Sequence, residues 1–147
     1  CLLLRYHGAA GQGYHASCPA AVFRALNEDF ADGDLVECFA SPLNCFFDRF
    51  CSAHADIDAA FGSMGSFFAF RPASGSFQVN PPFVETVMVR AAQHCEELLK
   101  DSEAGRGPSE RPLAFTFVCP GWKESQALAL LKRSAFNRGE VLIAAVD

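Results

Sequence analysis

The chain has 147 residues, half of them hydrophobic, and its 15 Phe residues give it enough bulk to bury the core of one domain. A net charge of −5 argues against a broad surface that binds nucleic-acid phosphates, because nonspecific affinity for nucleic acid depends on many Lys and Arg side chains. There is no apolar run of about 18 residues and no leader peptide, so we expect a soluble intracellular protein without a membrane span. Because the chain opens on Cys-Leu-Leu-Leu instead of Met, we expect it to be part of a longer protein.

The seven cysteines predict neither disulfides nor a metal site. Their number is odd and none of them forms a Cys-x-x-Cys pair, so a disulfide framework is not expected. Cys38, Cys45, Cys51 and His54 are close enough in sequence for a zinc site to be considered, but Cys51 and His54 fall on an apolar helical stripe. We therefore predict buried thiols that behave as small hydrophobic side chains, and no bound metal.

The first part of the chain predicts a loop and then a helix. Residues 1–18 contain clustered glycines, but no strand precedes them and they do not form the Gly-x-Gly-x-x-Gly pattern of a dinucleotide site. Residues 19–30 predict a helix that begins at Pro19, because Val22, Phe23 and Leu26 lie at helical spacing and polar residues follow.

Residues 35–40 predict a short buried strand, and a helix is expected directly after it. Ser41 suits the N-cap and Pro42 the first helical position, and one apolar face continues to His54. A strand, a tight turn and a helix form the ligand-binding corner of open α/β sheets, where a helix N-terminus and Asn44 would hold a cofactor carboxylate. An ordinary strand–helix turn remains an alternative on these residues alone.

The rest of the chain alternates between strands and helices. The expected elements, in chain order, are a strand at 67–70, a strand at 77–79, a helix at 84–99, a charged surface loop at 101–112, a strand at 113–119, a helix from the 120–122 turn to about Phe136, and a strand at 141–146. This alternation predicts an α/β fold with a mostly parallel sheet.

The tetrapeptide Asn80-Pro81-Pro82-Phe83 follows one of these strands and suits the methylation of an exocyclic amine on a nucleobase. The Asn80 amide oxygen and a carbonyl of the prolines could each accept one N–H, which localises the lone pair of the amine. The prolines hold these acceptors rigidly, and Phe83 offers a ring face on which a base can stack. The alternative is that Asn80 caps a helix whose first turn contains the prolines.

Three further residues are candidate contacts to the substrate. Trp122 lies where a strand meets its loop, on the edge at which open α/β sheets bind ligands, although it could equally fill the core. Arg71 and Lys123 are basic residues in predicted loops and could contact RNA phosphates.

Three blocks of sequence, residues 37–47, 61–63 and 74–83, closely resemble the phosphorylated CTD-interacting factor family. In that family these blocks form the catalytic core of a cap-specific adenosine methyltransferase, which uses S-adenosylmethionine to make N6-methyladenosine on the 2′-O-methylated adenosine beside the mRNA cap. The resemblance implies a Rossmann-like S-adenosylmethionine-dependent methyltransferase core over residues 31–147. Residues 1–30 would belong to a preceding helical region.

The family motifs can be transferred to this chain residue by residue. The catalytic residues would be Asn80, Pro81, Pro82 and Phe83. The residues that bind the cofactor would be Glu37, Phe39, Ser41, Pro42 and Asn44. This chain has Ala69 where family members carry an acidic residue, so no acid is assigned to the cofactor ribose.

The resemblance also implies partners and a location. Capped mRNA would be the substrate, and the phosphorylated C-terminal domain of RNA polymerase II would bind in the nucleus through a WW domain that lies outside this chain. Two alternatives stay open. One is a catalytically inactive module of the same fold that binds RNA or the polymerase tail, and the other is a DNA or protein-glutamine amino methyltransferase.

Overall fold

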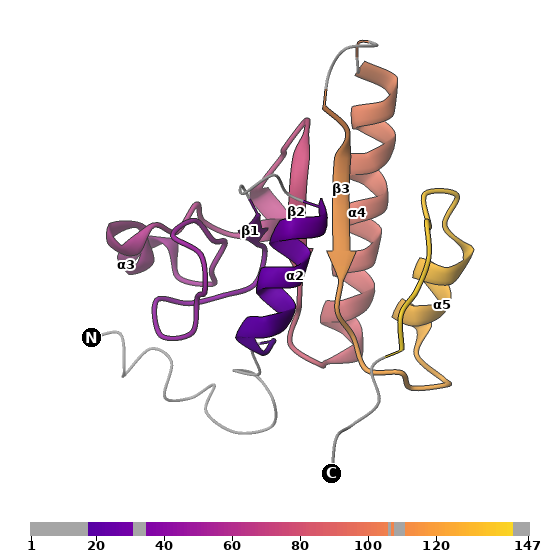
Figure 1. The fold of residues 1–147 in the computed structure, drawn as a ribbon, viewed down its shortest axis with the longest axis horizontal. Coiled ribbons are helices and arrows are strands. Elements are labelled where there is room, and N and C mark those ends of the chain that lie inside the picture. Colours follow the sequence, from indigo (N-terminus) through magenta and orange to yellow (C-terminus); the bar gives the residue numbers. More distant parts are fainter. Residues whose placement is uncertain (1–17, 31–34, 106, 108–110, 143–147) are drawn as a thin grey trace.

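The structure is a computed structural model, and it describes residues 18–30, 35–105, 107 and 111–142. Figure 1 shows the arrangement of its elements. In chain order they are α2 (Ala20–Phe30), β1 (Val36–Glu37), α3 (Ala55–Asp58), η1 (Ala59–Phe61), η2 (Phe67–Ala69), β2 (Gly75–Val79), α4 (Glu85–Gly105), β3 (Leu113–Phe117) and α5 (Gln126–Arg133). Most of the expected loop at residues 1–18 lies outside the described residues.

The three described strands form one parallel sheet in the order β1-β2-β3. The central strand β2 pairs with β3 along its whole length, from Gly75 opposite Leu113 to Val79 opposite Phe117. Because parallel neighbours need a crossover connection, α4 follows β2 and returns the chain to the start of β3. This arrangement confirms the predicted α/β fold with a parallel sheet.

The core lies between the sheet and α4, and helices cover both faces of the sheet. In Figure 1, α4 runs behind the strands and α2 crosses in front of them. Met88, Ala91, Cys95 and Leu98 recur at helical spacing on α4 and are buried. Three of these side chains join strand residues such as Val79 in one hydrophobic cluster. Each Å² of apolar surface that is buried contributes about 25 cal/mol to the free energy of unfolding, so this layer is the main source of stability.

The helix expected from Ser41 to His54 is wrong, because the backbone there makes hydrogen bonds to other partners. Only one turn forms, in which Cys45 N donates to Ser41 O at 2.9 Å. The next two N–H groups, of Phe46 and Phe47, donate to Glu37 Oε1 and do not continue a helix. Phe50 then forms parallel bridges with Glu37 and Ser63. The apolar residues that looked like one helical face are therefore divided between the core and a surface loop.

Other expected boundaries also differ from the structure. Residues 67–70 contain the 3₁₀ turn η2 and no strand, since Phe70 N donates to Phe67 O at 3.0 Å. Helix α4 continues to Gly105, and α5 ends at Arg133. Val141 and Leu142 are exposed and form no strand, and the remaining residues of the strand expected at 141–146 lie outside the described residues.

Candidate active site at the carboxyl edge of the sheet

The loops that follow the three strands begin at one edge of the sheet. Cys38 N donates to Gln78 O at 2.8 Å, and Val118 N donates to Val79 O at 2.8 Å. These bonds place the loops after β1 and β3 on either side of Asn80, which directly follows β2. In Figure 1, the loops that leave β2 and β3 lie together at the lower end of the sheet. This carboxyl edge is where open α/β sheets bind their ligands.

The tetrapeptide lies outside helix α4 and does not form its first turn. Helix α4 begins at Glu85, so both prolines come before it. The Pro81 side chain is fully buried, and Pro82 O accepts from Val84 N at 2.6 Å. Asn80 is half-buried and its Oδ1 atom is buried. The interpretation of Asn80 as a helix cap is therefore wrong, and the segment forms a rigid loop at the edge of the sheet.

Phe83 and Trp122 meet at this edge, although they come from different loops. Their ring centroids are 6.5 Å apart and their planes lie at 77°, which is an edge-to-face contact. Trp122 is 49% exposed and Phe83 is half-buried, so Trp122 does not fill the core. Two aromatic rings at this edge offer surfaces on which a nucleobase can stack.

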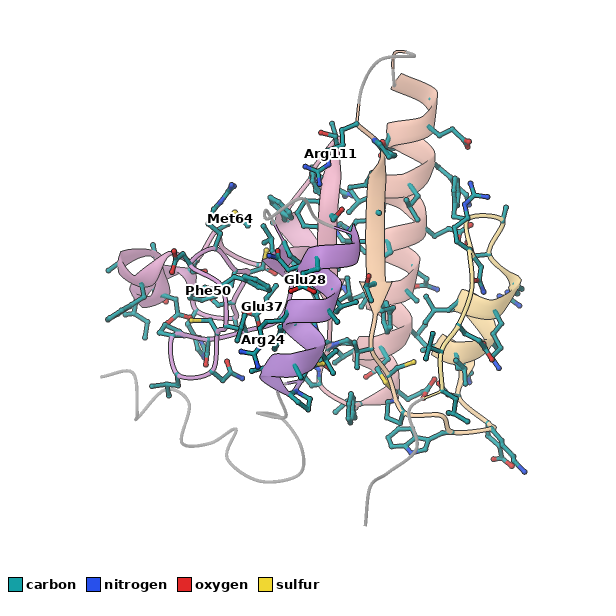
Figure 2. The ribbon with its side chains drawn as sticks, viewed as in Figure 1. Arg24, Glu28, Glu37, Phe50, Met64 and Arg111 are labelled. Carbon is teal, nitrogen blue, oxygen red and sulfur yellow. The ribbon has the colours of Figure 1, made fainter. Side chains whose placement is uncertain are left out.

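The loop after β1 is held by a buried carboxylate. Glu37 Oε1 accepts from Phe46 N at 2.6 Å and from Phe47 N at 3.0 Å, and the side chain is 3% exposed. Figure 2 labels Glu37 and Phe50, which meet where this loop returns to the sheet. Burial raises the pKa of Glu37, and the two backbone N–H groups partly oppose this effect. Glu37 therefore positions the loop.

The other residues predicted to bind a cofactor form a turn and an aromatic cluster. Ser41 is buried and its hydroxyl donates to Asn44 Oδ1 at 2.9 Å, while Pro42 is half-buried between them. Phe39 contacts Phe67, with ring centroids 5.3 Å apart. No helix begins at Ser41, so the predicted capture of a carboxylate by a helix N-terminus is wrong. This turn belongs to the loop that follows β1.

The two basic candidates lie in different places. Lys123 is exposed and directly follows Trp122, so it lies at the candidate site. Arg71 lies beside the later turns of α4, where its Nη1 atom forms an ion pair with Glu97 at 3.1 Å. Glu97 is about three turns from the start of α4, so Arg71 lies away from the tetrapeptide. The structure therefore brings Lys123 to the site and leaves Arg71 outside it.

Sequence reasoning missed a connection between α4 and α5. Glu85 Oε1 accepts from Ala127 N at 2.9 Å and from the Ser125 hydroxyl at 3.2 Å. Ser125 is the N-cap of α5, where its side chain accepts from Leu128 N. The sequence indicates a Glu at the start of one helix and a Ser before another. It does not indicate that the two residues meet across 40 positions.

The part of the chain that the structure describes contains no group of three or more His, Cys, Asp or Glu side chains that could hold a metal ion. Cys38, Cys51 and Cys95 are buried, and burial raises the pKa of each thiol. None of the described helices is long and apolar enough to cross a membrane.

The chain is similar to known proteins along its whole length. Residues 1–147 match the family model described as "Phosphorylated CTD interacting factor 1 WW domain". A human protein named mRNA (2′-O-methyladenosine-N(6)-)-methyltransferase is 41% identical over 155 residues, which cover 100% of this chain and 21% of the human protein. A mouse protein of the same name is 40% identical over the same shares. The chain thus spans about a fifth of the length of these relatives. It belongs to the phosphorylated CTD interacting factor 1 family.

Proposed function

We propose that this chain carries the methyl-transfer site of an S-adenosylmethionine-dependent RNA methyltransferase. Its substrate would be capped mRNA, and the methyl group would go to the N6 amine of the cap-adjacent 2′-O-methyladenosine. The observation that carries this proposal is the rigid Asn80–Phe83 loop outside helix α4, with the ring of Trp122 beside Phe83. The names of the human and mouse relatives support the same reaction.

The residues at the β1 end of this edge fit such a cofactor. Gln78 is 1% exposed, and its Oε1 atom has no hydrogen-bond partner within the described part of the chain. It is the register partner of Glu37, so two buried polar side chains lie side by side on one face of the sheet. With the Ser41–Asn44 turn and the Phe39 ring, they would hold a ligand that has both polar and ring-shaped parts. When bound, S-adenosylmethionine would supply a methyl group from a positively charged sulfur, with the S–CH₃ bond breaking and the donor leaving as a neutral thioether.

The tetrapeptide would activate the amine by accepting its hydrogen bonds. The Asn80 amide oxygen would accept one N–H, and we assign the second acceptor to the Pro81 carbonyl because Pro82 O is already bonded to Val84 N. These acceptors favour a tetrahedral nitrogen whose lone pair can attack. The nitrogen gains the methyl group and releases one proton to water, and no titrating base is needed. Phe83 and Trp122 would hold the base once it leaves its stack.

The test is methyl transfer to a capped RNA that starts with 2′-O-methyladenosine. It uses this chain and a chimera in which residues 1–147 replace the matched segment of the human relative. Asn80→Ala should lower the rate about a hundredfold or more, because one preorganised hydrogen-bond partner of the transition state is lost. Asn137→Ala, in an exposed loop beyond α5, is the matched control and should leave the rate unchanged.

Three outcomes would contradict the proposal. Equal rates for the wild type and Asn80→Ala would exclude the proposed mechanism. RNA binding without transfer by either protein would indicate the inactive module. Competition by DNA or by a glutamine peptide, but not by capped RNA, would indicate the other amino methyltransferases. For the whole protein, we propose action in the nucleus, with the phosphorylated polymerase tail as a partner that the family description suggests.

A further inference from the structure

The Phe83–Trp122 contact needs support beyond its own packing. The two residues belong to loops that follow different strands, and only their ring edges and faces meet, at 6.5 Å between centroids. Because Trp122 is 49% exposed, its neighbours cover only about half of the residue and constrain its orientation less than a core would. A further contact that fixes its loop would therefore affect where the ring lies.

Glu85 makes that contact. It is the first residue of α4, two positions after Phe83, and its Oε1 atom accepts from the Ser125 hydroxyl and from Ala127 N. Ser125 N in turn donates to Trp122 O at 3.1 Å. A short path of hydrogen bonds therefore runs from the first residue of α4 to the backbone of Trp122.

The chemistry of this path favours a fixed geometry. A carboxylate acceptor makes hydrogen bonds about twice as strong as neutral groups do. It also lies at the N-terminus of α5 (Gln126–Arg133), where the helix dipole favours negative charge. The Ser125 hydroxyl donates to Glu85 and accepts from Leu128 N, so both of its roles are used.

We propose that Glu85 is a positioning residue that fixes Trp122 relative to Phe83, and hence the aromatic surface that receives the target base. The role of this surface rests on the proposed function, whereas the effect of Glu85 on Trp122 does not. Glu85 touches neither the base nor the methyl donor in this proposal, and it acts only through the loop of Trp122.

The chain offers a matched control on the same helix. Glu96 Oε2 accepts from the hydroxyl of Ser134, at 2.5 Å, and Ser134 is the C-cap of α5. Glu85 and Glu96 thus hold opposite ends of α5 against α4 by the same kind of bond, and only Glu85 lies beside the candidate site. If both bonds only hold α5 against α4, Glu85→Ala and Glu96→Ala should have similar effects on Trp122 fluorescence and on methyl transfer.

The first measurement is the quenching of tryptophan fluorescence by acrylamide, since Trp122 is the only tryptophan in the chain. Glu85→Ala should increase the quenching constant and shift the emission to the red, whereas Glu96→Ala should do neither. Glu85→Gln, which keeps an acceptor oxygen, should restore the wild-type spectrum and guards against a variant that fails to fold. Unchanged quenching in Glu85→Ala, or an equal change in Glu96→Ala, would overturn the proposal.

The second measurement is methyl transfer by the chimera, with kcat and KM determined separately. Glu85→Ala should lower kcat/KM about tenfold to a hundredfold, because misplaced groups lose that much rate, and part of the loss should be a higher KM for RNA. Glu96→Ala should stay close to the wild type. If the fluorescence changes as expected and no protein transfers methyl groups, the proposed function fails and the role of Glu85 in holding Trp122 stands.

Discussion

At the scale of single residues, buried carboxylates decide how the loops are held. One carboxylate oxygen of Glu37 accepts hydrogen bonds from two backbone N–H groups of the loop after β1, and burial raises the pKa of this side chain. A carboxyl group whose pKa is higher in the folded state stabilises the fold below its unfolded pKa. This contribution is lost as the pH rises through the folded pKa. The charge of Glu37 therefore weakens the fold near neutral pH.

Glu37→Gln tests this point, because the amide keeps one acceptor oxygen and removes the charge. The free energy of unfolding of the variant, relative to the wild type, should increase as the pH rises above about 4.3, the ordinary pKa of a glutamate, and through the higher pKa of the folded state. Urea unfolding followed by circular dichroism at several pH values gives the difference. A difference that stays constant across this range would show that the Glu37 pKa is the same in both states.

At the scale of elements, the loop after β1 replaces the helix that the sequence favoured, and a glycine makes its path possible. Gly62 has φ of +100°, and a Cβ atom there would lie 2.1 Å from Asp48 O, inside van der Waals contact. Gly65 has φ of +87°, but the nearest atom to its Cβ would be Ala55 Cβ at 3.8 Å. An alanine would have a strained backbone at either position, but its Cβ would clash with a neighbouring atom only at position 62.

Gly62→Ala and Gly65→Ala therefore separate strain from overlap. Gly65→Ala should lower the free energy of unfolding by about 1 kcal/mol, the cost of a left-handed alanine. Gly62→Ala should lower it by about 3 kcal/mol or more, because the backbone at Asp48 must also move. Gly105→Ala, at a helix end with no atom within 4 Å of the new Cβ, is the control. Equal losses at Gly62 and Gly65 would contradict the predicted clash.

How much the sequence predicts depends on how local the signal is. The β2 strand and helix α4 follow from hydrophobic periodicity and turn residues within one stretch of chain, and the structure contains both. The helix expected at 42–54 does not form, because the N–H groups of Phe46 and Phe47 donate to Glu37. The Phe46 ring also stacks on Phe23, with ring centroids 4.9 Å apart. Such contacts between distant residues override a periodic pattern. The contact between Glu85 and Ser125 is hidden for the same reason.

At the scale of the whole chain, charge limits how the proposed RNA substrate can bind to these residues. The chain has 12 Lys and Arg against 17 Asp and Glu, and Lys123 is an exposed cation beside the candidate base contacts. Binding should therefore depend on stacking and on a few phosphate contacts. The salt dependence of RNA affinity should be shallow, since each neutralised phosphate on a single strand contributes about 0.7 to the slope of log K against log salt.

Lys123→Ala should reduce that slope by about 0.7, because one phosphate contact is lost. Fluorescence anisotropy of a capped RNA, titrated with the chimera at several salt concentrations, measures it. Lys100→Ala is the control, since Lys100 is paired with Glu96 at 3.3 Å on the exposed side of α4. An equal slope for the wild type and Lys123→Ala would remove Lys123 from the RNA contact.

The short strand β1 has a consequence for motion. It joins the sheet through two register pairs, whereas β2 and β3 share five. Local opening that frees residues 41–48, which lie between the ladder contacts of β1 and Phe50, therefore leaves the β2–α4–β3 unit closed. In hydrogen exchange, the amides of Phe46 and Phe47 should take up deuterium well before those of β2. A cofactor held by this loop would be detected first as slower exchange at these two amides.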